Sequence, residues 1–355
     1  MSEFWNQRTK NLSPYVPGEQ PKDRLFIKLN TNENPYPPSP KVLEAVKNAS
    51  DESLRLYPDP ECTALREAVA ERYGVKLEQV FAGNGSDEIL AFAFGAFFES
   101  AVPVLFPDIT YSFYPVYADL WDIRYCKIPL CDDFSINIKD YKETCGGAVL
   151  PNPNAPTGIA LPLDDILSLA DFLEEQGKVF VVDEAYAAFG TKSAIPHINK
   201  YSNLLTVHTL SKSASLAGLR AGFAIGNEKL IEGLRRIRDS FNSYTLDRLA
   251  IAGAAAAVKD AQYYEEINSR VIATRERVTK TICEFGFKVL PSSANFIFMQ
   301  APGIAGADFF AALRERGILV RHFNKERIAD YLRVSVGTDE EMDKFITACA
   351  EIKKT

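Results

Sequence analysis

The stretch L-L-T-V-H-T-L-S-K, residues 204–212, is the most informative for the fold. It contains an apolar strand, and Lys212 follows directly after the end of that strand. A lysine at such a place is often only a surface residue. Here Ser211 precedes it, and the run G-L-R-A-G at 218–222 can return Arg220 to the same pocket. An amine can bind an aldehyde covalently, while a guanidinium and a hydroxyl can hold a phosphate dianion. The three side chains therefore suit a small molecule that carries both an aldehyde and a phosphate.

The run V-F-V-V-D-E-A-Y, residues 179–186, places Asp183 at the end of a second apolar strand. Ligands of open α/β sheets bind at the carboxyl ends of strands, so Asp183 is expected to face the same crevice. A carboxylate there needs a cation or a hydrogen-bond donor as its partner. The alternative is an acid that only caps the following turn.

Two loops that follow strands add further candidate ligands. The turn F-A-G-N-G-S-D-E, residues 81–88, precedes a helix, so the free N–H groups of Gly85, Ser86 and Asp87 would form an anion site at the positive end of that helix. The alternative is a plain turn with Ser86 or Asp87 as the N-cap. The proline-rich loop P-N-P-N-A-P-T-G, residues 151–158, can aim an amide side chain, or it can be a tight surface turn.

Strands alternate with helices along the chain, which predicts an α/β domain with a mainly parallel sheet. The expected strands cover residues 79–82, 102–106, 125–128, 148–150, 179–182, 204–209 and 223–225. The expected helices cover residues 62–73, 87–98, 163–176 and 229–239. One long helical stretch over about residues 247–285 is expected to lead into a smaller unit, with strands at 296–299 and 332–336 and a helix at 306–316. We therefore expect an extended arm over residues 1–35, a large domain over 36–250 and a small α+β domain over 251–355.

Composition excludes several classes of function. The 355 residues include 40 basic and 47 acidic side chains, and a net charge of −7 argues against nucleic acid or an anionic membrane as the partner. No apolar run is long enough to span a bilayer and no secretion signal is recognisable, so a cytoplasmic protein is expected. The six cysteines lack paired spacing and are expected to be reduced thiols, with a disulfide framework as the alternative. The three histidines stand apart from other ligands, so no metal site is expected.

Taken together and in this order, these segments resemble a known family. The run at 209–222, T-L-S-K-S-A-S-L-A-G-L-R-A-G, resembles the lysine signature of the fold-type-I pyridoxal-phosphate aminotransferases, and D-E-A-Y at 183–186 and N-A-P-T-G at 154–158 resemble its other two landmarks. Segments across nearly the whole chain are similar to the histidinol-phosphate aminotransferase family: L-S-P-Y-V-P-G-E at 12–19, L-N-T-N-E-N-P-Y at 29–36, R-L-Y-P-D-P at 55–60, Y-S-F-Y at 111–114, S-A-N-F at 293–296, G-I-L-V-R at 317–321 and L-R-V-S-V-G-T at 332–338.

The resemblance implies a seven-stranded central sheet and pyridoxal 5'-phosphate as the cofactor. Lys212 would bind its aldehyde and carry a proton between the substrate α-carbon and the cofactor. Asp183 would keep the pyridine nitrogen protonated, which makes the ring an electron sink. Tyr186 would hydrogen-bond the ring oxygen. Tyr111 would stack on the ring, with a plain core aromatic as the alternative.

The resemblance also implies a homodimer with shared active sites. The cofactor phosphate would be held by the amides of Gly85, Ser86 and Asp87 together with Ser211 and Arg220. Tyr57 of the partner subunit would reach the same phosphate, and the N-terminal arm would pack on the small domain and on the partner.

For the substrate, the resemblance implies that Arg333 forms a bidentate fork with a carboxylate, while Arg321, Tyr15 and Asn295 recognise the distal end. A surface salt bridge is the alternative for each arginine. The implied reaction moves an amino group from glutamate, which leaves as 2-oxoglutarate, to imidazole acetol phosphate, which becomes histidinol phosphate in histidine biosynthesis. Three alternatives stay open: an aromatic amino-acid aminotransferase, a decarboxylase of a phosphorylated amino acid, and a regulatory cofactor-binding module without catalysis.

One position departs from the family pattern. Many relatives place an asparagine directly before Pro-Thr-Gly, where it binds the ring oxygen of the cofactor. This chain has Ala155 there and Asn154 one residue earlier. Either the loop lets Asn154 reach the ring, or Tyr186 makes that contact alone.

Overall fold

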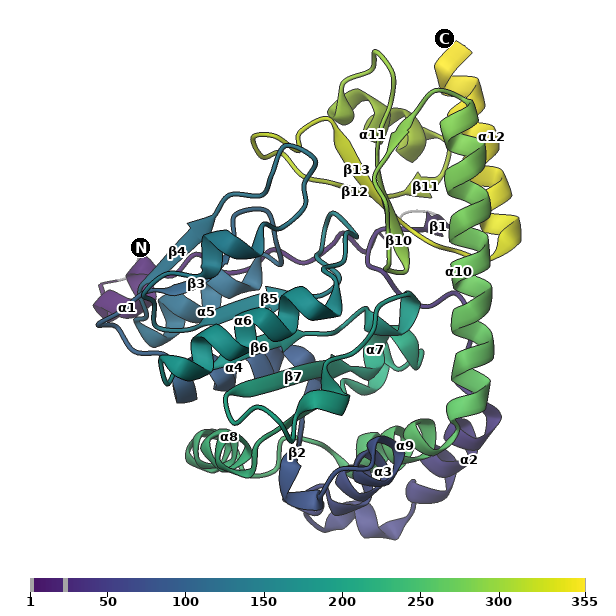
Figure 1. The fold of residues 1–355 in the computed structure, drawn as a ribbon. Coiled ribbons are helices and arrows are strands. Elements are labelled where there is room, and N and C mark those ends of the chain that lie inside the picture. Colours follow the sequence, from purple (N-terminus) through teal and green to yellow (C-terminus); the bar gives the residue numbers. More distant parts are fainter. Residues whose placement is uncertain (1–2, 22–24, 355) are drawn as a thin grey trace.

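A computed structural model of the chain describes residues 3–21 and 25–354. Residues 1–2 and 22–24 of the predicted arm, and residue 355 at the end of the predicted small domain, lie outside the described residues. The described chain forms a large sheet flanked by helices and a smaller sheet near the C-terminus (Figure 1).

The large sheet has seven strands in the order β2-β8-β7-β6-β5-β3-β4. Its strands are β2 (Val80–Gly83), β3 (Val104–Pro107), β4 (Tyr125–Ile128), β5 (Ala148–Pro151), β6 (Phe180–Asp183), β7 (Leu204–Thr209) and β8 (Gly222–Gly226). All neighbouring pairs are parallel except those of β8, which runs antiparallel to both β2 and β7. The prediction of a mainly parallel, seven-stranded sheet is confirmed.

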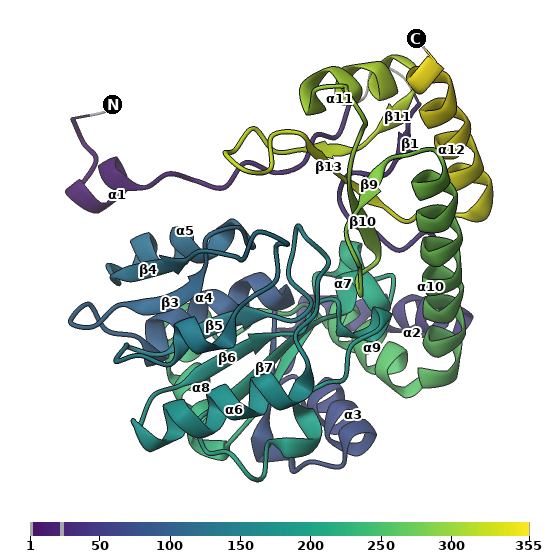
Figure 2. The same cartoon turned by 45° about the horizontal axis from the view of Figure 1, so that its top comes forward.

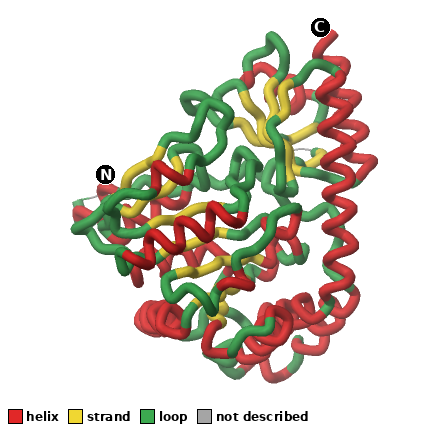
Figure 3. Tube along the Cα trace, viewed as in Figure 1, coloured by secondary structure: helices red, strands yellow, loops and turns green. Residues whose placement is uncertain are grey.

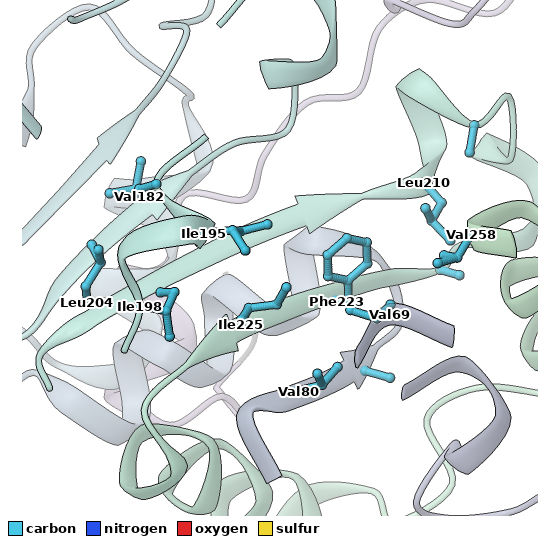
Figure 4. Close-up of a cluster of buried hydrophobic side chains, with 14 of the residues drawn as sticks. Val69, Val80, Val182, Ile195, Ile198, Leu204, Leu210, Phe223, Ile225 and Val258 are labelled. Carbon is cyan, nitrogen blue, oxygen red and sulfur yellow. The ribbon is translucent and has the colours of Figure 1, made fainter. Parts of the chain in front are cut away.

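Helices cover both faces of this sheet, because successive side chains of a strand point to opposite faces and both faces are apolar. In β6, Val182 packs toward one face and Val181 toward the other. The first face is covered by α3 (Thr63–Tyr73), α6 (Leu163–Glu175) and α9 (Arg248–Lys259). The second is covered by α4 (Gly85–Phe97), α5 (Phe113–Trp121) and α8 (Glu228–Phe241). Figure 4 shows side chains of the first of these cores, among them Val182, Leu204, Phe223 and Val258. The layers of helix and strand are also visible in Figure 3.

The C-terminal unit contains an antiparallel sheet in the order β12-β13-β10-β9. Its elements are β9 (Lys288–Val289), β10 (Phe296–Gln300), β12 (Arg321–His322), β13 (Tyr331–Ser335), α10 (Ala261–Glu284), α11 (Gly306–Glu315) and α12 (Asp339–Lys354). Apolar side chains of all three helices pack on one side of this sheet. Helix α10 runs from the neighbourhood of α2 (Pro40–Ala49) and α9 to α12 and joins the two units (Figure 1).

The N-terminal segment reaches both units. Strand β1 (Ile27–Lys28) pairs in parallel with β11 (Ile318–Leu319), so residues far apart in sequence share a small second sheet. The described residues 3–21 of this segment, which include α1 (Gln7–Asn11), lie above the large unit (Figure 2). The other helices are α2 (Pro40–Ala49) and α7 (Leu210–Ser213). Short 3-10 helices cover Glu52–Arg55, Leu77–Gln79, Ile138–Tyr141, Ala187–Phe189, Ile195–His197 and Ala217–Leu219.

The expected single helical stretch over 247–285 is wrong in one respect, since the chain breaks into α9 and α10 at Asp260. This residue leaves helical geometry, with φ −93° and ψ 48°, and its carboxylate pairs with Lys41 of α2 at 2.6 Å. Helix α9 packs against α2 and α3 of the large unit. The predicted domain boundary at residue 250 therefore lies inside α9, and the exact division of the chain stays a prediction.

Candidate active site

A cavity of about 270 Å³ lies where β5, β6 and β7 end, between the large unit, the C-terminal unit and the N-terminal segment. Its size is near the lower end for small-molecule sites, about 300 Å³. Most of the predicted site residues line it: Tyr15, Ser86, Asp87, Tyr111, Asp183, Tyr186, Ser211, Lys212, Arg220, Arg321 and Arg333. The predicted residues that do not line it are Gly85, Asn154, Tyr57 and Asn295.

Lys212 is carried by α7, a helix of a single turn directly after β7. The hydroxyl of Thr209 accepts a hydrogen bond from the N–H of Ser211 at 3.1 Å and so caps this turn. The Lys212 amine donates to the carbonyl oxygen of Thr31 at 2.9 Å. Burial, assisted by the positive charge of Arg333, lowers the pKa of Lys212 to about 8. The amine is therefore far closer to its neutral, nucleophilic form at physiological pH than an exposed lysine would be.

Asp183 ends β6 and is buried. Its Oδ2 accepts a hydrogen bond from the hydroxyl of Tyr114 at 2.9 Å, and its Oδ1 accepts one from the N–H of Ala185 at 3.1 Å. Burial raises the pKa of Asp183 to about 6, while these two hydrogen bonds act in the opposite direction. The residue thus caps the next turn and also presents a buried carboxylate to the cavity, so the two interpretations offered by the sequence are compatible.

Arg220 lines the cavity beside the N-terminus of α4. Its Nη2 donates to Asp87 Oδ2 at 2.9 Å, and its Nη1 donates to Ser211 Oγ at 3.3 Å. Asn84, and neither Ser86 nor Asp87, stands at the N-cap of α4, so residues 85–87 form the first turn of the helix with their N–H groups free of intrahelical partners. A guanidinium, a hydroxyl and a helix N-terminus therefore converge at one place.

Two glycines make this close approach possible. Gly85 has φ +75°, and a Cβ there would lie 2.9 Å from Arg220 Nη2. A Cβ on Gly222 would lie 2.8 Å from the carbonyl carbon of Gly85 and 2.9 Å from the nitrogen of Ser86. Any side chain at either position would fill the space beside the helix N-terminus.

Two tyrosines, Tyr111 and Tyr186, line the walls of the cavity. The Tyr111 hydroxyl donates to Asp87 Oδ1 at 2.6 Å. The Tyr186 hydroxyl accepts a hydrogen bond from Asn32 Nδ2 at 2.9 Å, which leaves its own proton available for another acceptor. Tyr111 lines the cavity, so it is not a plain core aromatic.

The C-terminal unit supplies two neighbouring arginines. Arg321 of β12 and Arg333 of β13 are direct partners in the antiparallel ladder. Arg333 donates to the carbonyl oxygen of Asn30 at 3.1 Å, and Arg321 lies 3.4 Å from the carbonyl oxygen of Val16. Neither arginine has a carboxylate partner within the described parts of the chain. Both therefore remain able to bind an anion, and the salt-bridge alternative does not hold for either.

Tyr15 belongs to the N-terminal segment and closes the cavity from that side. Its ring stacks on Phe113 with a centroid distance of 4.3 Å. Tyr57, in contrast, is 78% exposed and stacks on Tyr244 at 4.7 Å, outside the cavity of its own chain.

Asn154 and Asn295 are buried supports of neighbouring loops. Asn154 donates to the carbonyl oxygen of Ile109 at 2.9 Å and accepts from the Thr110 hydroxyl at 3.0 Å, and Ala155 lines the cavity in its place. Asn295 donates to the carbonyl oxygen of Asn32 at 3.0 Å. The Asn154 amide is thus engaged within its own loop, whereas Asn295 Oδ1 is buried without a hydrogen-bond partner among the described residues.

Two contributors were not predicted. Tyr114 is the partner of Asp183, and Asn32 is the partner of Tyr186. Asn32 has φ +56° and also hydrogen-bonds Ser335, so the N-terminal segment is fastened to β13 beside the cavity. The motifs Y-S-F-Y and L-N-T-N-E-N-P-Y contain both residues, but their spacing alone carries no sign of these contacts.

The donor set fits pyridoxal phosphate. The cavity brings together one amine of lowered pKa, one buried carboxylate and a cluster of a guanidinium, a hydroxyl and helix N–H groups. These are the partners that an aldehyde, a pyridine nitrogen and a phosphate require. The space beside the helix N-terminus that a Cβ on Gly85 or Gly222 would fill is suited to the phosphate.

A neighbouring cavity of about 330 Å³ is larger but lacks this chemistry. It contains Glu184 and His208, whose Oε2 and Nε2 lie 3.3 Å apart. Burial raises the pKa of Glu184 to about 7 and lowers that of His208 to about 3. Glu184 accepts hydrogen bonds from the N–H of Ala194 and the hydroxyl of Ser193, so it holds the loop after β6. No lysine lines this cavity within the described residues.

The described residues contain no helix that is long and apolar enough to cross a membrane. Across the same residues, no group of three or more His, Cys, Asp or Glu side chains could hold a metal ion. All six cysteines are free.

Comparison with known proteins gives a consistent result. Residues 25–348 match the model of the aminotransferase class I and II family. The histidinol-phosphate aminotransferase of Clostridium acetobutylicum is 54% identical over 351 residues, which is 99% of each chain. That of Clostridium beijerinckii is 51% identical over 98% of this chain and 96% of its own. The crystal structure of the Sinorhizobium meliloti histidinol-phosphate aminotransferase in complex with pyridoxal-5'-phosphate is 24% identical, covers 100% of this chain and 98% of its own, and has a TM-score of 0.89, so it shares the fold.

Proposed function

The chain belongs to the aminotransferase class I and II family, and from this premise we propose that it is a histidinol-phosphate aminotransferase that uses pyridoxal 5'-phosphate. The single observation that supports this most strongly is the convergence of Lys212, Asp183 and Arg220 on one cavity in a chain whose relatives carry that name over their full length.

Pyridoxal phosphate, when bound, supplies an aldehyde for a substrate amine and a protonated ring that accepts an electron pair from the substrate α-carbon. Lys212 would bind that aldehyde between reactions, because burial makes its amine a better nucleophile. Once displaced by a substrate amine, the same group would take the proton from the substrate α-carbon and return it at the carbon of the cofactor's aldehyde group.

Asp183 would hold a proton at the ring nitrogen through a charge-assisted hydrogen bond. Tyr186 would donate to the ring oxygen, since its hydroxyl already accepts from Asn32 and its proton is free. Tyr111, held by Asp87, would cover one face of the ring. Asn154, held within its own loop, would support that loop and leave the ring oxygen to Tyr186.

Arg220, Ser211 and the amides of Gly85, Ser86 and Asp87 would hold the cofactor phosphate. Tyr57 is proposed to reach the phosphate of a second copy of the chain, which makes the protein a homodimer with shared sites. Its high exposure beside Tyr244 supports a role outside its own subunit. The six free cysteines support a reducing compartment such as the cytoplasm.

The substrates proposed are glutamate with 2-oxoglutarate and histidinol phosphate with imidazole acetol phosphate. Arg333 would form the fork with the substrate carboxylate, and Arg321 would stabilise the second anionic group. Tyr15 would close the distal end, and Asn295 would act there through Asn32, whose carbonyl it binds. Two adjacent arginines that have no carboxylate partner among the described residues suit a site that accepts both a dicarboxylate and a phosphate ester.

A substrate panel tests this proposal. Purified protein with pyridoxal phosphate and glutamate is given imidazole acetol phosphate, phenylpyruvate or 4-hydroxyphenylpyruvate, and 2-oxoglutarate formation is measured. We expect the largest kcat/KM with imidazole acetol phosphate. A preference for the phenyl acceptors would identify an aromatic amino-acid aminotransferase, and release of carbon dioxide without amino exchange would identify a decarboxylase.

A further inference from the structure

We propose that Tyr114 is a positioning residue that keeps Asp183 ionised and correctly oriented. The role of Asp183 toward a pyridine nitrogen rests on the proposed function. The contact between the two side chains, and its effect on the carboxylate, can be measured in the protein without any cofactor.

Tyr114 is held rigidly where it can act on Asp183. It lies in the first turn of α5 and has no solvent exposure. Its ring packs against Phe94, Phe106 and Tyr111, with centroid distances of 6.4, 5.8 and 5.7 Å. Close packing on three sides restricts the movement of this ring, and its hydroxyl lies 2.9 Å from Asp183 Oδ2. The orientation of the carboxylate is therefore set by α5 as well as by β6.

The two oxygens of Asp183 have separate donors. Oδ1 accepts from the backbone of Ala185, which every residue type at position 185 other than proline would supply. Oδ2 accepts from Tyr114, which is the only side-chain donor to Asp183 within the described residues. Removal of the Tyr114 hydroxyl would therefore leave half of a buried carboxylate without a donor, at a substantial cost to the charged form.

The surroundings otherwise disfavour a charge on Asp183. The titratable and charged groups that face it are Asp87 from α4, Tyr114 and Tyr117 from α5, Glu184 and Tyr186 from the loop after β6, and Lys212 and Arg220 across the cavity. Burial and Asp87 raise the pKa of Asp183, and the hydrogen bond from Tyr114 is the largest influence that lowers it.

A phenol suits this task better than a cation would. Burial and the neighbouring carboxylate raise the pKa of Tyr114 well above its ordinary value, so it stays a neutral donor. A lysine or arginine in its place would cancel the charge of Asp183 and repel a protonated ring nitrogen. A neutral donor stabilises the carboxylate and leaves its full negative charge available to the ligand.

The test is the pKa of Asp183 in the cofactor-free protein, measured by carbon NMR of the protein labelled at aspartate Cγ. The Asp183 signal is assigned as the one missing from Asp183→Asn. Tyr114→Phe removes only the hydroxyl, and Tyr141→Phe is the matched control, since Tyr141 is also fully buried but its hydroxyl has no partner within the described residues. Comparable melting temperatures of the two variants establish that both are folded.

We expect Tyr114→Phe to raise the pKa of Asp183 by about one to two units relative to Tyr141→Phe, which is the shift that loss of one hydrogen bond to a charged group produces. An unchanged pKa would overturn the proposal. This readout needs no cofactor or substrate, so it is independent of whether the proposed reaction is correct.

A second readout separates positioning from folding. In the loaded enzyme we expect Tyr114→Phe to lower kcat about tenfold with little change in KM, because an Asp183 of higher pKa would leave the ring nitrogen less fully protonated. The pH at which the absorbance of the bound cofactor changes should move in the same variant and stay in place in Tyr141→Phe. Equal behaviour of the two variants would contradict the role given to Tyr114.

Discussion

The amine of Lys212 donates a hydrogen bond to the carbonyl oxygen of Thr31, and the two atoms lie 2.9 Å apart although the residues are separated by 181 positions. Thr31 follows β1, which pairs with β11 of the C-terminal unit. The environment of the reactive lysine is therefore completed by the N-terminal segment. The Thr31 carbonyl oxygen is the one hydrogen-bond partner of this amine among the described residues, so a ligand aldehyde has a single contact to displace.

The pH dependence of cofactor attachment should report the lowered pKa of Lys212. Its amine is protonated below about pH 8 and neutral above, because burial disfavours the charged form. The rate at which cofactor-free protein binds pyridoxal phosphate covalently, followed by absorbance, should rise toward pH 8 and then level off. A rate that keeps rising to about pH 10, as for an exposed lysine, would contradict the lowered pKa of Lys212. Lys212→Ala is the control and should show no attachment.

Arg220→Gln should weaken binding of pyridoxal phosphate by about 10- to 100-fold, because one charge-assisted contact to the phosphate is lost. Binding of pyridoxal, which has no phosphate, should change little. The measurement is equilibrium titration of the cofactor-free protein with each compound. Arg236→Gln, at an exposed arginine of α8 paired with Glu232, is the matched control. Equal weakening for both compounds would show that Arg220 supports the fold and not the phosphate.

Arg333→Lys should lower kcat/KM for glutamate about 100-fold, since a lysine cannot form the bidentate fork to a carboxylate. The absorbance of the bound cofactor should stay normal, because Arg333 is not expected to touch the cofactor. Arg124→Lys, an exposed arginine bound to the carbonyl oxygen of Ser100, controls for the substitution itself. The measurement is steady-state kinetics, and an unchanged kcat/KM would show that Arg333 does not bind the substrate carboxylate.

Tyr57→Phe should weaken the binding of pyridoxal phosphate and leave the binding of pyridoxal unchanged. The protein itself should sediment as a dimer of the 39.5 kDa chain. Loss of a single hydrogen bond to a charged group predicts about a tenfold effect. Tyr244→Phe, at the ring that stacks on Tyr57, is the control. A monomeric protein with full cofactor affinity would contradict the shared site.

The sequence was sufficient to predict which residues at the strand ends lie together at the cavity. Lys212 and Asp183 each follow an apolar strand, and in a parallel sheet such ends meet at one edge. Arg220 was also predictable, because a short connection returns the chain to that edge. The α/β class and the sheet of the large unit follow from the same alternation of strands and helices.

Contacts between distant segments were not predictable. Tyr114 lies on α5, which was absent from the expected helices and has Pro115 in its first turn. Proline is tolerated in the first turn, where its missing N–H would have no intrahelical partner. Asn32 reaches Tyr186 and Ser335 only through tertiary folding, and Asn154 uses its amide within its own loop, which its position before Ala155 does not reveal.

The covalent bond between Lys212 and the cofactor is the most direct test of the proposed chemistry. The protein is incubated with pyridoxal phosphate, reduced with borohydride, digested and mapped by mass spectrometry. We expect the added mass on Lys212 and on no other lysine. Modification of a different lysine, or an active enzyme without modification at Lys212, would contradict the account.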